Sequence, residues 1–255
     1  MRNLPLANRK PEVELFSKML ARHTAARILL VEAQSGVGKS DLLAQFKREC
    51  SGKAHVAMVD LKAAERGVAY FFWRAREELG HAHFQNLAAA THRILFGPNV
   101  TIEKNWILGK QEIEIALHGD DKTRAFLLDA LHEAFFQDLR AIDEKLVLII
   151  DTYNAAGAEL GKWIGGEFLA AVVHSPNLLV VIAGQNVPTP SVEWMDEFEH
   201  RKLEGIRDAE AWHECAQRAG IAFERRDIET LCWLFDGHPA GMTTALKKRA
   251  AELGL

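Results

Sequence analysis

The sequence is poor in the features that build disulfide frameworks, membrane spans and polyanion-binding surfaces. It has three cysteines in 255 residues, without CxxC spacing, so neither a disulfide framework nor a zinc knuckle is indicated. No apolar run approaches the roughly 20 residues that cross a bilayer, and Met1 to Lys10 contains no continuous apolar segment of signal-peptide type. Lys and Arg number 31 against 35 Asp and Glu, and a net charge of −4 advertises no surface for a polyanion. We therefore expect a soluble, cytoplasmic protein without membrane contact, whose cysteines are small core residues.

Length and composition indicate one large domain or one domain with a smaller appendage. Hydrophobic residues make up 48% and charged residues 26%, which is ordinary globular usage. Four short runs rich in Ile, Leu and Val have the pattern of strands that are apolar on both faces, and such strands favour a parallel sheet covered by helices. The runs are Ile28 to Val31, His55 to Leu61, Leu146 to Ile150 and Leu178 to Ala183.

Helical spacing of apolar residues fills most of the remaining chain. Residues 62–145 hold several helical patterns broken near glycine, which predicts a helical insertion between two strands. After Gly205 the pattern predicts three helices, with Asp208 and Asp227 as the N-caps of the first two. These helices are predicted at Asp208 to Ala219, Asp227 to Phe235 and Pro239 to Glu252.

A glycine-containing loop between a predicted strand and a predicted helix is the most specific feature. Residues 33–40 read Ala-Gln-Ser-Gly-Val-Gly-Lys-Ser and meet the GxxxxGK[ST] pattern except at the first position, where Ala33 replaces glycine. In such a P-loop, backbone N–H groups converge on phosphate oxygens, Lys39 reaches the β- and γ-phosphates, and Ser40 ligates Mg²⁺. The predicted phosphate-binding residues are Ser35, Gly36, Val37, Gly38, Lys39, Ser40 and Asp41.

A carboxylate suited to the same Mg²⁺ ends the apolar run from Leu146 to Asp151. Read alone, an Asp at this place is often only a strand-end cap, but its pairing with the P-loop makes Asp151 a candidate magnesium ligand. Its position after the long insertion predicts that another strand lies between the two motifs, as in the additional-strand branch of P-loop proteins.

Together these segments resemble the signal-transduction ATPases with numerous domains (STAND), the AAA+-related class that includes NACHT and apoptotic ATPase modules. Residues 6–15 are similar to the family's N-terminal segment, and Gly-His-Pro at residues 237–239 matches its GxP motif. The resemblance implies that Arg9 and Pro239 lie near the nucleotide base. It also implies that residues 200–206 form a short strand leading into a helical lid, and that ATP or ADP binds with Mg²⁺.

Three positions depart from the family pattern. At the first, Ala33, we expect nucleotide binding to survive. The second is Asn154, where many relatives carry an acidic residue that activates water, and an amide cannot accept a proton from water at neutral pH. The third is Gln185, where relatives often carry an arginine, so the site gains no positive charge there. The catalytic positions that the resemblance implies are Lys39, Asp151, Asn154 and Gln185.

The sequence therefore predicts an α/β P-loop NTPase with a mostly parallel five-stranded sheet of additional-strand type and a C-terminal helical lid. Residues 1–205 form the nucleotide-binding domain and residues 206–255 the lid. We expect a nucleotide-dependent conformational switch with slow or absent hydrolysis, although Arg74 or Arg76 of the insertion could supply charge in trans. Its output would be a protein partner or a homo-oligomer. One alternative is a DNA-associated AAA+ loader or transposition-type ATPase, against which the net charge argues mildly. Another is a degenerate scaffold that binds no nucleotide.

Overall fold

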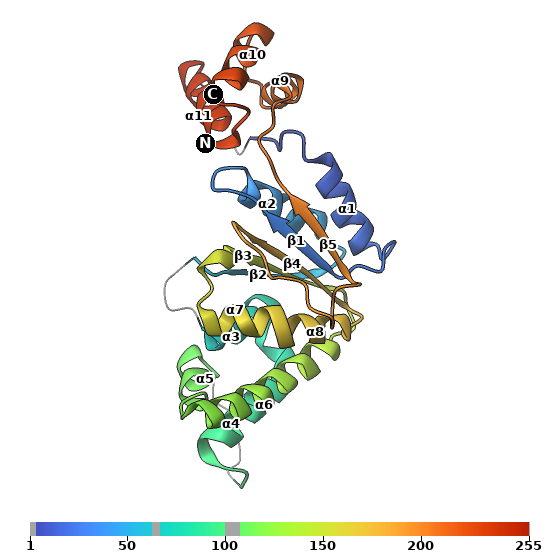
Figure 1. The fold of residues 1–255 in the computed structure, drawn as a ribbon, viewed down its shortest axis with the longest axis vertical. Helices are drawn as coiled ribbons and strands as arrows, with labels where there is room; N and C mark the ends of the chain where they lie inside the picture. Colours follow the sequence, from blue (N-terminus) through green and yellow to red (C-terminus); the bar gives the residue numbers. More distant parts are fainter. Residues whose placement is uncertain (1–3, 63–66, 100–107, 255) are drawn as a thin grey trace.

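The computed structural model describes residues 4–62, 67–99 and 108–254, which are built around a five-stranded, all-parallel sheet (Figure 1). The strand order is β2-β3-β4-β1-β5. In the register of the sheet, Val180 of β4 lies opposite Ile28 of β1 and Leu148 of β3. This order confirms the additional-strand arrangement, with β4 between the strands that carry the two motifs. The strands are β1 (Ile28–Glu32), β2 (His55–Asp60), β3 (Leu146–Asp151), β4 (Leu178–Gly184) and β5 (Phe198–Lys202).

Side-chain alternation along the strands divides the core into two layers. In β1, Ile28 faces one layer and Leu29 the other. Helices α1 and α2 cover the layer of Leu29, where Phe16 and Phe46 stack with ring centroids 4.3 Å apart. Helices α3, α7 and α8 contribute to the layer of Ile28 (Figure 1). Because both faces are covered, strands β1, β3 and β4 are apolar and buried, whereas the edge strand β5 is polar and partly exposed. The helices are α1 (Lys10–Leu20), α2 (Lys39–Glu49), α3 (Val68–Leu79), α7 (Ala158–Trp163) and α8 (Leu169–Val173), with a π-helical turn at Ile164–Phe168 between the last two and a 3-10 turn at Tyr153–Ala155.

Helices also fill the interval between β2 and β3. Asp138 of α6 accepts hydrogen bonds from the backbone N–H groups of Asn86 and Leu87, at 3.0 and 2.8 Å, and so satisfies the first turn of α4. Phe71 and Phe72 of α3 are fully buried and belong to the hydrophobic core. Besides α3, the interval holds a 3-10 turn at His81–His83, α4 (Gln85–Phe96), α5 (Lys110–Ala116) and α6 (Asp121–Arg140).

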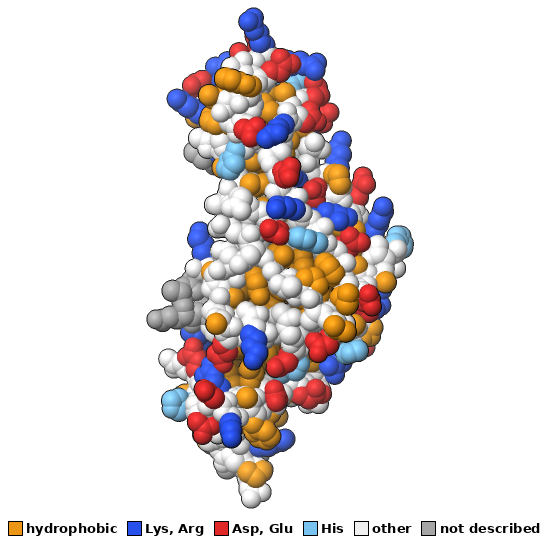
Figure 2. Space-filling model, viewed as in Figure 1, with side chains coloured by type: hydrophobic (Ala, Val, Ile, Leu, Met, Phe, Trp, Pro, Cys, Tyr) orange, Lys and Arg blue, Asp and Glu red, His pale blue; other side chains and the backbone are white. Residues whose placement is uncertain are grey.

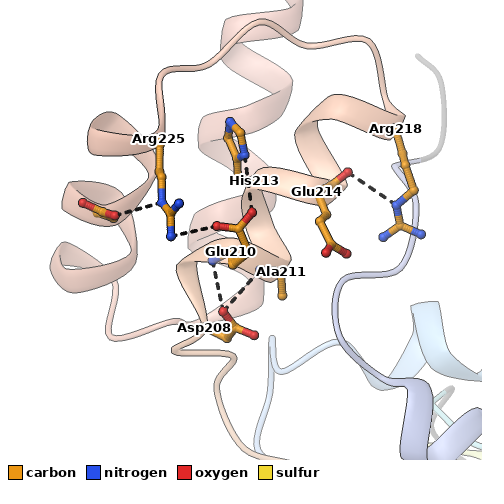
Figure 3. Close-up of polar contacts among 8 residues, drawn as sticks. Asp208, Glu210, Ala211, His213, Glu214, Arg218 and Arg225 are labelled. Carbon is orange, nitrogen blue, oxygen red and sulfur yellow. Dashed lines mark hydrogen bonds and ion pairs between the residues drawn. The ribbon is translucent and has the colours of Figure 1, made fainter.

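Three helices after β5, which we term the C-terminal helices, form a lobe joined to the rest by a narrower neck (Figures 1 and 2). They share a hydrophobic cluster built around Trp212, Met242 and Leu246. Asp208 caps the first of them, because its carboxylate accepts from the N–H groups of Glu210 and Ala211 at 3.0 and 3.3 Å (Figure 3). They are α9 (Ala209–Arg218), α10 (Arg225–Leu234) and α11 (Pro239–Glu252).

Two predictions for this end of the chain are wrong. Helix α10 begins at Arg225 with Glu224 at the N-cap, so Asp227 lies inside the first turn. The strand predicted at residues 200–206 is β5, which ends at Lys202. Beyond β5, the Leu203 N–H still donates to Glu32 O of β1, at 2.8 Å, and the Ile206 N–H donates to Gly237 O, at 2.8 Å, which joins the chain to the C-terminal helices.

Two features are absent from the described part of the chain. None of its helices is long and apolar enough to cross a membrane. Its His, Cys, Asp and Glu side chains form no group of three that could hold a metal ion. All three cysteines are buried and free, as the sequence predicted.

Candidate nucleotide-binding site

The P-loop connects the carboxyl end of β1 to α2 through two left-handed glycines. Gly36 has φ +78° and Gly38, at the N-cap of α2, has φ +94°. Side chains rarely adopt this backbone conformation, which explains glycine at both positions. No side chain caps α2, so the free N–H groups of its first turn face the loop and attract an anion.

Lys39 begins α2 and folds back over the loop. Its Nζ donates to Ala33 O at 2.5 Å and to Gln34 O at 2.8 Å. Burial lowers the pKa of the Lys39 ammonium, and the nearby Asp151 carboxylate opposes that shift. The ammonium is thus held at the mouth of the loop by two carbonyl oxygens, which phosphate oxygens can replace.

Asp151 ends β3 and is buried, with 8% of its surface exposed. Burial raises the pKa of its carboxyl, the 2.7 Å hydrogen bond from the Thr152 N–H opposes the shift, and nearby Asp60 adds to it. The buried carboxylate of Asp151 and the hydroxyl of Ser40 line one cavity and suit Mg²⁺, which prefers hard oxygen ligands. These two residues are the predicted magnesium ligands, and the structure brings them to one cavity.

Asn154 and Gln185, the two departures from the family's catalytic pattern, lie side by side. The Asn154 Oδ1 accepts a hydrogen bond from the Gln185 N–H at 3.0 Å. Gly184 makes this approach possible, because a Cβ there would collide with Asn186 O and lie 3.3 Å from the Asn154 nitrogen. The amide oxygen of Asn154 is therefore occupied by the backbone of the neighbouring strand end.

A cavity of about 350 Å³ collects these groups at the carboxyl edge of the sheet. It contains all the predicted catalytic and magnesium positions, and the start of α11 closes one side. Sequence reasoning missed Lys62, which enters the cavity just after β2. Its only sequence signal was a lysine two residues beyond a strand-end Asp60, whose carboxylate accepts from the Lys62 N–H at 2.9 Å. The residues that line this cavity include Ser35, Lys39, Ser40, Lys62, Asp151, Asn154, Gln185, Pro239 and Thr243.

A second, narrower cavity of about 110 Å³ continues from the first between α2 and the C-terminal helices. Gly38, Asp41 and Pro239 line both cavities. Arg9 also lines the second, but its Nη2 donates to Val37 O at 3.1 Å and to Glu204 O at 2.7 Å. The predicted contact of Pro239 and Arg9 with a nucleotide base stays a prediction, and the cavity offers the space for it.

The two arginines considered for charge in trans lie elsewhere. Arg76 is buried in the insertion and donates to Leu108 O at 2.7 Å. Arg74 pairs with Glu78 one turn along α3. Neither arginine lines the two cavities.

Solved structures match this chain, whereas no family model and no curated protein matches it. The Cdc6 protein of Pyrobaculum aerophilum has a TM-score of 0.51 at 12% identity, over 100% of this chain and 64% of that one. A chain of the HORMA:CdnC:Trip13 complex of E. coli MS115-1 has a TM-score of 0.49 at 10% identity, over 90% and 74%. The RuvB Holliday junction branch migration motor of Thermotoga maritima has a TM-score of 0.44 at 13% identity, over 96% and 61%.

These similarities concern the fold. The chain therefore shares with the Cdc6 protein an α/β fold, here a five-stranded parallel sheet with a P-loop and C-terminal helices. The chain spans less than two thirds of the Cdc6 and RuvB chains that it matches. The STAND resemblance is finer than this fold class and stays a prediction.

Proposed function

We propose that this protein is an ATP- and ADP-binding module that acts as a nucleotide-dependent conformational switch with slow or absent hydrolysis. One observation carries the proposal. The cavity that holds the P-loop lysine and Asp151 is also lined by Pro239 and Thr243 of α11. A nucleotide seated there touches the sheet and the C-terminal helices at once, so binding alters how the two are held together.

We propose a role for each group that lines the cavity. The P-loop N–H groups and Lys39 would bind the β- and γ-phosphates, and Ser40 and Asp151 would hold Mg²⁺. When bound, Mg²⁺ neutralises phosphate charge. Gln185 contacts the γ-phosphate as an uncharged donor. The loop reads phosphates and not the base, so adenine is proposed from the family resemblance and from the second cavity beside Pro239.

Slow turnover is proposed from the state of the catalytic positions. Asn154 cannot take a proton from water, and its amide oxygen already accepts from the Gln185 N–H. Gln185 brings no charge, and losing an arginine from a phosphoryl-transfer site reduces rates by roughly a thousandfold or more. ATP is therefore bound for long periods before it is hydrolysed.

Titration calorimetry with Mg-ADP and Mg-ATP tests binding and needs one matched pair of variants. Lys39→Ala removes the cavity lysine, whereas Lys47→Ala removes an exposed lysine from the last turn of the same helix. We expect Lys39→Ala to abolish binding and Lys47→Ala to leave it unchanged. Absence of binding in the unmodified protein contradicts the proposal and favours the scaffold alternative. Steady turnover above about 1 per second, within ordinary enzyme rates, contradicts slow hydrolysis.

The output is proposed to be association with a second copy or with a protein partner. Sedimentation velocity in ATP and in ADP tests the first of these, and we expect the sedimentation coefficient to differ between the two nucleotides. Identical profiles restrict the output to a different protein. ATP-dependent retention on DNA that falls with salt would instead support the loader alternative.

A further inference from the structure

The carbonyl oxygens on one side of the P-loop, which we term its outer side, contact residues that do not belong to the sheet. Three successive carbonyl oxygens, those of Ser35, Gly36 and Val37, each have a partner there. Ser35 O lies 3.2 Å from the Nε2 of His238, Gly36 O accepts from the Ala240 N–H at 3.0 Å, and Val37 O accepts from Arg9 at 3.1 Å. Since a carbonyl oxygen can only accept, this contact is a hydrogen bond in the His238 tautomer that carries its hydrogen on Nε2.

Two of the three partners belong to the start of α11. His238 is its N-cap residue, and Ala240 lies in its first turn, where backbone N–H groups have no acceptor inside the helix. Pro239 between them has no N–H to satisfy. The loop carbonyl at Gly36 thus completes the hydrogen bonding of α11, and the His238 ring adds a side-chain contact beside it.

The third partner, Arg9, is also tied to the C-terminal helices. It ends an N-terminal strap, residues 4–9, whose Ala7 is buried in their hydrophobic cluster. Arg218 of α9 donates to Leu6 O at 3.0 Å, and the Cys215 thiol donates to Pro5 O at 3.1 Å. Figure 3 shows Arg218 near the end of α9. All three contacts therefore connect the P-loop to the C-terminal helices and to the N-terminal strap that packs against them.

The opposite side of the same peptides is the side that binds phosphate. In a trans peptide the C=O and the N–H point in opposite directions, and no cis peptide occurs among the described residues. With the carbonyls of residues 35–37 held outward, the N–H groups of Gly36, Val37 and Gly38 point away from the C-terminal helices. Within residues 4–62, 67–99 and 108–254, no acceptor binds those three N–H groups. They are oriented and free for an anion.

We infer that His238 and Arg9 are positioning residues, which fix the P-loop peptides from outside and so couple phosphate binding to docking of the C-terminal helices. This inference rests on the proposed function and supplies its linkage. Phosphate binding and docking of the helices require the same peptide orientation. By thermodynamic reciprocity, each stabilises the other.

The space around Gly36 fits this arrangement. A Cβ at Gly36 would lie 2.5 Å from Cε1 of His238 and 3.2 Å from the Cβ of Ala240. At Gly38, one turn of the loop away, a Cβ would meet only the Cβ of Pro239, at an ordinary 3.8 Å. Of these two glycines, only Gly36, whose carbonyl α11 binds, lies close against the helix.

The test compares ligands that differ only in phosphate. Competition against a fluorescent ADP gives the affinities of ADP and of adenosine for the intact protein and for His238→Ala, His238→Gln and Arg9→Met. We expect His238→Ala to weaken ADP by about fivefold to tenfold, the worth of one hydrogen bond, and to leave adenosine unchanged, and we expect Arg9→Met to weaken ADP more than it weakens adenosine. Glutamine can donate to Ser35 O, so His238→Gln should restore ADP affinity. His213→Ala, which alters a histidine on α9 away from the P-loop, is the matched control and should change neither ligand.

Hydrogen exchange at the Ala240 N–H gives an independent reading of docking. Its exchange should slow when ADP is added to the unmodified protein and should stay fast in His238→Ala. Equal weakening of ADP and adenosine, or no weakening of either, overturns the inference while the proposed function stands. An unmodified protein that binds no nucleotide overturns both.

Discussion

Replacing Gly36 by alanine should destabilise the protein more than the same change at Gly38, although both glycines are left-handed. The backbone penalty for alanine in this region is about 1–2 kcal/mol and applies to both positions. At Gly38 the new methyl makes only an ordinary contact. The Gly38→Ala variant therefore measures the conformational penalty alone.

At Gly36 the new methyl group cannot coexist with His238, whose Cε1 would be 2.5 Å away. The His238 ring must turn away, which breaks its contact with Ser35 O, and the Ala240 Cβ, 3.2 Å from the new methyl, must give by a few tenths of an ångström, which weakens the hydrogen bond from the Ala240 N–H to Gly36 O. Each such bond contributes about 1 kcal/mol. We expect Gly36→Ala to lower the free energy of unfolding by about 1–2 kcal/mol more than Gly38→Ala does. Adding His238→Ala to Gly36→Ala removes the clash with the ring and should recover at most about 1 kcal/mol.

Urea unfolding gives the free energies, and trypsin cleavage after Arg207 reports on the neck. Arg207 is exposed and pairs with Asp236 of the C-terminal helices, with 2.9 Å between Nε and Oδ1. Cleavage should accelerate in Gly36→Ala and not in Gly38→Ala. Equal loss of stability in the two variants, with equal cleavage rates, would refute the view that α11 rests on the P-loop at Gly36.

Three further predictions concern charged residues. Lys62→Ala should weaken Mg-ATP binding by about fivefold and Mg-ADP binding less, because the attraction of the exposed Lys62 ammonium to the outermost phosphate contributes about 1 kcal/mol. Equal effects on the two nucleotides, measured by calorimetry, would exclude that role. Asp151→Asn should stabilise the nucleotide-free protein at pH 7, since burial raises the pKa of Asp151 and makes its charged form unfavourable in the folded state. Urea unfolding measures the difference in free energy of unfolding between Asp151→Asn and the unmodified protein. This difference should shrink as the pH falls through the raised pKa and the carboxyl becomes neutral, and a difference that stays constant would contradict the prediction. Asp208→Ala should lower the free energy of unfolding by about 1 kcal/mol through the lost cap, whereas Asp227→Ala, which removes no cap, should change it by less than about 0.5 kcal/mol.

The buried strands and the P-loop could be predicted because their signals are local. Strands β3 and β4 are apolar on both faces, and each ends at a polar residue or glycine. The loop from Ala33 to Ser40 holds two glycines, Gly36 and Gly38, and a helix start within eight residues. The order of the strands followed from the long insertion between the two motifs.

Features that depend on tertiary contacts could not be predicted. Strand β5 is a polar edge strand in which apolar and polar residues do not alternate, so the predicted bounds of this strand were wrong. Asp227 has the same local signal as Asp208, but α10 begins earlier, at Arg225. Nothing near Arg76 in the sequence indicated burial, which arises from its contact with Leu108.

The contacts on the outer side of the P-loop illustrate the same limit at the site. His238 and Ser35 are 203 residues apart in the sequence, and Arg9 reaches Val37 from another direction. The sequence marked Pro239 through a family motif but gave no reason to single out His238. Only the packed structure shows that the residue between glycine and proline contacts the loop backbone.

The central claim is that a nucleotide binds at the junction of the P-loop and the C-terminal helices, and mass spectrometry of bound nucleotide tests it most directly. The protein is incubated with Mg-ATP, separated from free nucleotide by gel filtration and denatured, and the released nucleotide is identified and counted. The account predicts close to one ATP or ADP per chain, and none for Lys39→Ala. No nucleotide from the unmodified protein, or an equal amount from Lys39→Ala, would contradict it.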